Sequence, residues 1–162
     1  MDDECSSLKL LKKDYNRLRE KYGLPEFSVL NEEFSIEKVA DSETETLLRE
    51  IRKFIVDKIM NYMRFVENIL NPVNAPMFIF SLIKLITPED KKKLEGIYKD
   101  LMKKELVFIE LDLEFSEERD AKFIKDNFDF WSSTKKEILS VIKKVDSKWD
   151  DNVEVDSKGY FG

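Results

Sequence analysis

Residues 42–72 of the chain, SETETLLREIRKFIVDKIMNYMRFVENILNP, predict a long central helix and so decide the fold class. The segment opens with Ser42-Glu43-Thr44-Glu45, which matches the S-x-x-E capping box, and closes with the helix-ending pair Asn71-Pro72. From Phe54 onward, apolar residues occupy more than one face, which is typical of a helix in the middle of a bundle. The apolar positions at helical spacing are Leu47, Leu48, Ile51, Phe54, Ile55, Ile59, Tyr62, Val66, Ile69 and Leu70.

The next two segments extend the helical pattern. Residues 76–86 are almost entirely apolar, so we expect a second central helix there. Thr87-Pro88-Glu89-Asp90 then combines a capping residue, a first-turn proline and two acids at the positive end of a helix dipole. This combination predicts the start of a further helix, whose expected buried residues are Leu94, Ile97, Tyr98, Leu101 and Met102.

Residues 106–115, LVFIELDLEF, fit two conformations. From Ile109 to Phe115, apolar residues alternate with acids, which is the period of a strand. The helical stripe of the preceding segment also continues through this stretch. We favour a helix or an extended crossover and leave both open, because a lone strand would need a partner strand. The residues of the stripe are Tyr98, Met102, Leu106, Ile109 and Leu113.

The N-terminal part predicts covering helices. An apolar stripe at steps of three and four residues ends at Gly23, a typical helix-ending residue. Short helical turns are expected between residues 26 and 41. The stripe consists of Leu8, Leu11, Tyr15, Leu18 and Tyr22.

The C-terminal part predicts two more helices and a tail. One helix is expected after Ser116, and Thr134 with Glu137 forms a second capping box that predicts the start of a separate last helix. We therefore expect an all-α fold: a single-domain helical bundle over residues 1–149 with long central antiparallel helices. Residues 150–162 are expected to form an acidic tail.

Composition excludes most familiar catalytic chemistry. The 162 residues contain no His, one Cys (Cys5) and four Gly, with 28 Lys and Arg against 34 Asp and Glu, a net charge of −6. Without His there is no Ser-His triad and no His-ligated zinc, and a single thiol allows neither a disulfide nor a Cys-based zinc site. No glycines have phosphate-loop spacing. We identify no catalytic or cofactor-binding residue.

The sequence shows no pattern typical of a targeting signal or a membrane span. The acidic start Met1 to Cys5 is unlike the basic start of a signal peptide. The longest apolar run, Met77 to Ile86, is shorter than the roughly 18–20 residues that span a bilayer. We therefore expect a soluble cytoplasmic protein without a membrane partner.

Residues 105–120 hold seven acids and one base, Arg119. On a helix, Glu110, Glu114 and Glu117 would share a face, where their repulsion could be relieved by Mg²⁺ or Mn²⁺. This spacing supports an alternative hypothesis, a metal-dependent phosphohydrolase or nucleotide-binding bundle. We favour a solvated acidic face without a metal, since exposed carboxylates are the common case.

Lysine pairs raise a weaker alternative, contact with nucleic acid. Residues 51–100 sum to only +3 and the flanking regions are acidic, so no coherent basic footprint is predicted. The lysines alternate with acids at helical spacing, which is typical of an ordinary charged face.

Aromatic residues are the candidate partner-binding elements: Phe130 and Trp131 in one segment, Tyr160 and Phe161 in the tail. Aromatic side chains contribute strongly to interfaces, although the same residues could complete the core. The sequence thus favours a non-enzymatic scaffold or subunit that binds a protein partner or forms a homo-oligomer. It leaves open the partner, the pathway and the oligomeric state.

Overall fold

The computed structural model describes residues 2–41 and 45–152, and these contain only helices. The all-α prediction is confirmed. In chain order the elements are α1 (Asp2–Tyr22), α2 (Phe27–Phe34), a 3-10 helix η1 (Ile36–Asp41), α3 (Leu47–Leu70), α4 (Met77–Leu85), α5 (Pro88–Leu113) and α6 (Glu117–Asn152).

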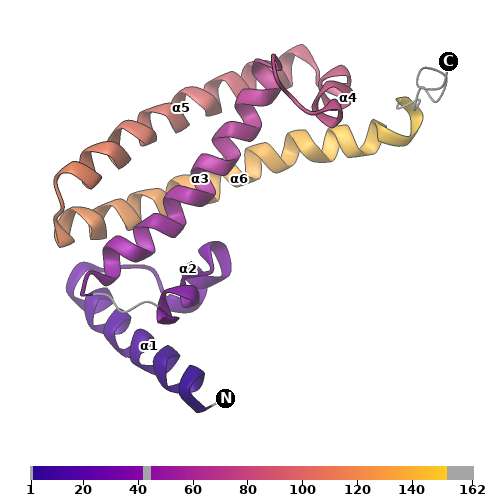
Figure 1. Cartoon of the computed structure of the whole chain (residues 1–162). Helices are drawn as coiled ribbons and strands as arrows, with labels where there is room; N and C mark the ends of the chain where they lie inside the picture. The colour runs from indigo at the N-terminus through magenta and orange to yellow at the C-terminus, as the bar shows by residue number, and fades with distance from the viewer. Residues whose placement is uncertain (1, 42–44, 153–162) are drawn as a thin grey trace.

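Helix α3 lies at the centre, as predicted. It packs against α2, η1, α4, α5 and α6, and Figure 1 shows it crossing the long α5–α6 hairpin. Its side chains Ile51, Ile55 and Ile59 are completely buried. The helix begins later than the capping box predicts: its N-cap is Thr46, and Glu45, expected in the first turn, is not helical. Residues 42–44 of the predicted box lie outside the described residues.

Helix α1 covers one end of the bundle with the predicted stripe. Leu11, Tyr15 and Leu18 are buried, and the Tyr15 hydroxyl donates to the Pro25 carbonyl at 2.7 Å. Burial raises the pKa of Tyr15 far above its ordinary range. The helix ends at Gly23, whose φ of +65° is favourable for glycine and costly for other residues.

Helix α5 settles the ambiguity of residues 106–115. It runs without interruption to Leu113, with Phe108 and Leu111 buried, so the extended alternative is wrong. A short turn reverses the chain, and α6 runs back beside α5 (Figure 1). The alternation of apolar and acidic residues therefore does not reflect a strand. The acids at 110, 112 and 114 each pair with an arginine on another helix.

The prediction that residues 76–86 form a central helix is wrong. Helix α4 has nine residues and buries only Ile79 and Leu82. Met77, Phe78 and Phe80 are 81%, 55% and 41% exposed. The helix packs at one end of the bundle against α3 and α6, where no further element covers its outer face among the described residues. Apolar composition here marks exposed surface rather than a central position.

The prediction of a separate helix starting at Thr134 is also wrong. Helix α6 has 36 residues without a break, about 54 Å at the usual rise. Thr134 is 5% exposed and lies within the helix, where the capping-box pattern has no terminus to cap. Buried residues on both sides of it, including Trp131 and Ile138, keep one helical phase, and no Gly or Pro interrupts it.

A buried ionic centre joins the three long helices. Arg52 of α3 is 1% exposed and donates to Asp112 Oδ1 of α5 at 2.6 Å. Its Nε lies 2.8 Å from Oδ1 of Asp120, a fully buried residue of α6. These two atoms attract as ions but are misaligned for a hydrogen bond. Burial raises the pKa of Asp120, while the charges of Arg52 and Arg49 oppose that shift.

We expect Arg52→Met to lower the free energy of unfolding by about 3–5 kcal/mol, because it leaves the Asp120 carboxylate buried and unpaired. The double variant Arg52→Met/Asp120→Leu should recover most of that loss, since it removes both charges. Arg64→Met, on the exposed side of the same helix, is the matched control and should change stability by about 0.5 kcal/mol or less. Urea unfolding measures all three. A double variant no more stable than Arg52→Met would contradict this account.

The N-terminus of α5 is tied to α6 through Asp90. Thr87 caps the helix as predicted, accepting the Asp90 backbone N–H at 3.1 Å, and its hydroxyl donates to Asp90 Oδ2 at 2.9 Å. Lys144 of α6 donates to Asp90 Oδ1 at 2.7 Å. The hydrogen bonds from Lys144 and Thr87 hold the pKa of this carboxyl below its ordinary 3.8.

A carboxyl with a lowered pKa in the folded state stabilises the fold above its unfolded pKa and loses that contribution as pH falls through its folded pKa. We therefore expect Asp90→Asn to lower the melting temperature most above about pH 5, and the difference from the native chain to shrink towards about pH 3. Asp100→Asn, on an exposed position of the same helix, serves as the control. An Asp90→Asn deficit that does not vary with pH would refute the charge-based explanation.

Candidate docking surfaces

The three carboxylates predicted as an alternative metal site are each hydrogen-bonded to a side chain of another helix. Arg119 donates to Glu110 at 2.6 Å and to Glu114 at 3.2 Å, so one guanidinium holds two of them. Glu117 accepts from the Tyr22 hydroxyl at 2.7 Å and from Lys21 at 3.0 Å. The Tyr22 and Lys21 hydrogen bonds hold the pKa of Glu117 below its ordinary value.

The acidic segment is thus an ion-pair network that connects helices. Its members reach cations on α1, α3 and α6. Within residues 2–41 and 45–152, no group of three or more acids or cysteines is arranged to hold a metal ion. The arrangement supports a structural use of these charges.

We expect millimolar Mg²⁺ or Mn²⁺ to leave the melting temperature unchanged, because these carboxylates already pair with Arg119 and Lys21. Thermal unfolding with and without metal measures this. A metal-dependent rise that disappears in Glu114→Gln would instead support the metal-site hypothesis, since a ligand of the folded state must raise its stability.

The lysine pairs do not gather at one place. Lys12 lies over the Phe27 ring at 5.5 Å and Lys104 over the Phe130 ring at 4.7 Å. Others pair with acids, as Lys144 does with Asp90. These lysines lie on three different helices, α1, α5 and α6. This distribution favours local structural roles for them over a single phosphate-binding surface.

The aromatic candidates have different surroundings. Trp131 is only 1% exposed, and its indole N–H donates to Glu33 at 3.1 Å. Phe130 is half-buried under Lys104. Tyr160 and Phe161 lie outside the described residues. Trp131 therefore belongs to the core, although it also lines a hollow between α3 and α6.

A groove with apolar walls follows α6. One hollow of about 350 Å³ lies between α3 and α6, and a second of about 240 Å³ lies between α4 and α6. Ile142 lines both, so the two hollows are neighbours along α6. Their other lining residues are Lys58, Tyr62, Trp131, Lys135, Ile138 and Leu139 in the first, and Phe78, Leu82, Val145, Asp146 and Trp149 in the second.

Two lysines stand at one end of this groove. Lys135 donates to Glu33 Oε1 at 2.6 Å, and the Lys58 ammonium lies 3.9 Å from Glu33 Oε2. Lys58 also lies 5.5 Å from the Trp131 ring centre. Burial, with a smaller contribution from Lys135, lowers the pKa of Lys58, while Glu33 opposes the shift. Two cations therefore share one carboxylate here.

A second apolar surface lies on α5. The helix has its buried stripe on the α3 and α6 side and a separate exposed stripe beside it. The exposed residues are Met102, Leu106, Ile109 and Leu113, which are 40%, 69%, 52% and 81% exposed. They recur at steps of 4, 3 and 4, which is the spacing of a helix-pairing seam. We call these four residues the α5 stripe.

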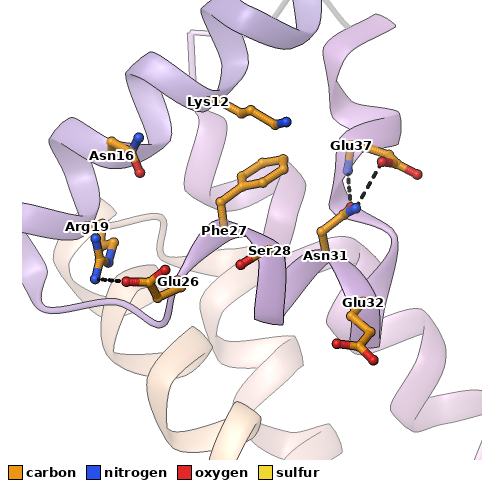
Figure 2. A pocket seen from close by; sticks show the side chains of 9 residues that line it. All are labelled: Lys12, Asn16, Arg19, Glu26, Phe27, Ser28, Asn31, Glu32 and Glu37. Atoms are coloured by element: carbon orange, nitrogen blue, oxygen red, sulfur yellow. Dashed lines mark hydrogen bonds and ion pairs between the residues drawn. The ribbon is translucent and has the colours of Figure 1, made fainter.

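A third hollow, of about 470 Å³, lies between α1 and α2 (Figure 2). Two contacts join its lining residues: Arg19 meets Glu26 at 2.6 Å, and Glu37 accepts from the Asn31 amide at 2.9 Å. These two contacts occupy Arg19, Glu26, Asn31 and Glu37 within the chain itself.

Comparison of the chain with protein families, with curated proteins and with solved structures finds no match. None of the described helices combines the length and apolarity needed to cross a bilayer. Function must therefore be argued from the surfaces themselves.

The sequence predicted the residues of the α5 stripe but did not predict that they are exposed. Met102, Leu106, Ile109 and Leu113 fit the predicted helical stripe, and only the packing of α5 shows that another face of the helix is buried. The groove had no sequence signal, because its walls come from helices that are distant in the chain.

Proposed function

We propose that the chain is a non-enzymatic, cytoplasmic scaffold or subunit that forms a homodimer through the α5 stripe. The observation that supports this is a row of four large apolar side chains on one long helix, each 40–81% exposed. Contiguous exposed apolar surface is unusual on a monomer and is typical of a protein interface. The occupant we propose is the same stripe of a second copy.

The charges beside the stripe favour antiparallel self-pairing. On its solvent side the helix has Lys99 and Lys103 in one half, then Glu110 and Glu114 towards its end, all exposed. In the antiparallel register that sets Met102 against Leu113 of the partner, Lys103 and the partner's Glu110 lie beside the seam at equivalent flanking positions. A twofold axis repeats this pair, so this flank of the seam is self-complementary. Arg119 balances only one of the two glutamates.

Magnitudes predict a dimer of modest affinity. Full burial of a large apolar side chain contributes roughly 1.5–3 kcal/mol, and the eight side chains of two stripes are only partly exposed. Association costs about 4–15 kcal/mol in lost freedom of motion. Because the free energy gained by burying the stripes is similar in size to the free energy that association costs, self-association should be measured at micromolar or higher protein concentrations.

We expect light scattering during size-exclusion chromatography to show a mass rising with concentration from 19.2 kDa towards twice that value. Leu113→Asp, at a position 81% exposed, should hold the chain at the monomer mass without loss of helix content. Leu10→Asp, at a position on α1 that is 59% exposed, is the matched control and should still dimerise. A native chain that stays monomeric at the highest concentration would refute the proposal.

Charge exchange tests the register. Lys103→Glu alone and Glu110→Lys alone should each weaken self-association, because each places like charges across the twofold axis. An equimolar mixture of the two variants should restore dimers, since residues 103 and 110 then meet as opposite charges in both pairs. If the mixture behaves as the separate variants do, the antiparallel register is wrong.

A further inference from the structure

We propose that the groove along α6 binds an amphipathic helix of another protein, with an acidic residue at its Lys58–Lys135 end and a basic residue at its Asp146 end. This goes beyond the proposed dimer and does not depend on it. The dimer uses the outer face of α5, whereas the groove is lined by α3, α4 and α6.

The shape of the groove fits the side chains of a helix. The α6 residues that line the two hollows are centred about eight positions apart, about 12 Å along the helix axis. A helix lying along α6 presents apolar side chains at that spacing from positions i and i+7 or i+8. One anchor would enter the hollow at Leu139, and the other the hollow at Trp149.

The lining residues are those that make strong contacts. Tyr62 and Trp131 lie 5.0 Å apart between ring centres, and Phe78 and Trp149 lie 5.6 Å apart. In each hollow an exposed ring, Tyr62 or Phe78, packs against a tryptophan, and aromatic residues are enriched at the positions that dominate binding energy. Leu139 and Phe78 are 44% and 55% exposed, so an occupant would remove apolar surface from water.

Charge sets the chemistry of the occupant. At one end, Lys58 and Lys135 share the single carboxylate of Glu33, which leaves one positive charge in excess. At the other end, the exposed Asp146 lies in the lining. An acidic residue of the occupant would pair with the lysines at one end, and a basic residue would pair with Asp146 at the other. Acids are favoured in the first turn of a helix and bases in its last turn. The occupant therefore runs in the same direction as α6.

The test is selection from a phage-displayed library of helices of about 16 residues, with random residues on one face, against the immobilised full chain. Bound phage are counter-selected on Leu139→Asp, whose substitution lies at an exposed position and leaves the core intact. We expect enriched sequences with apolar residues at i, i+3 or i+4, and i+7 or i+8, an acid in the first turn and a base in the last. No enrichment, or enrichment without this pattern, overturns the proposal.

Fluorescence anisotropy of a selected peptide gives the second readout. Leu139→Asp should weaken its binding at least about tenfold. Lys135→Gln should weaken it less, and should abolish the preference for the selected peptide over a version with its terminal charges exchanged. Leu113→Asp, which tests the dimer, should leave binding unchanged, so failure of one proposal is distinguishable from failure of the other. Equal binding to the native chain and to Leu139→Asp also overturns the groove assignment.

Discussion

The buried guanidinium of Arg52 is the constraint on which the arrangement of the long helices depends. It lies on the central helix and must meet a carboxylate on each of two other helices, Asp112 of α5 and Asp120 of α6. A slip of α6 would leave the fully buried Asp120 carboxylate without its cation, at a cost of several kcal/mol. Asp112 is 62% exposed, so its ion pair adds a link to α5 at a smaller cost if lost. The contact therefore fixes the register of α6 against α3 and links both helices to α5.

That register determines which side chains of α3 face α5 and which face the groove. Helix α3 turns Arg52 and Glu67 towards α5, and turns Lys58 and Tyr62 towards α6 and the groove. The α5 stripe consequently lies on one side of the bundle and the groove on another. Both proposed interactions can occur on one molecule, which is the arrangement that a scaffold requires.

Sequence reasoning succeeded where a local rule decides the structure. The proline and capping residue at Thr87-Pro88, the glycine at position 23 and the stripe of α3 all act through neighbouring residues, and each was confirmed. It failed for α4 and for the supposed start of a helix at Thr134, because both depend on what lies beside the segment. An apolar run does not say whether another element covers it, and a capping pattern does not say whether a terminus is present.

The candidate site shows the same limit more strongly. The acidic residues are close in sequence, and Arg119, which holds Glu110 and Glu114, is only 9 and 5 residues away from them. The other two partners are distant: Arg52 is 60 residues from Asp112, and Lys21 is 96 residues from Glu117. The groove likewise takes its walls from three helices. Pairings over such separations are set by packing, which no spacing rule contains.

The uninterrupted length of α6 has a mechanical consequence. At its start, Glu117 is held by α1, and near its end Trp149 packs against Phe78 of α4. About 48 Å of continuous helix separates these two contacts. The helix therefore fixes the distance between the two ends of the bundle. Two molecules bound at opposite ends would be held about that far apart.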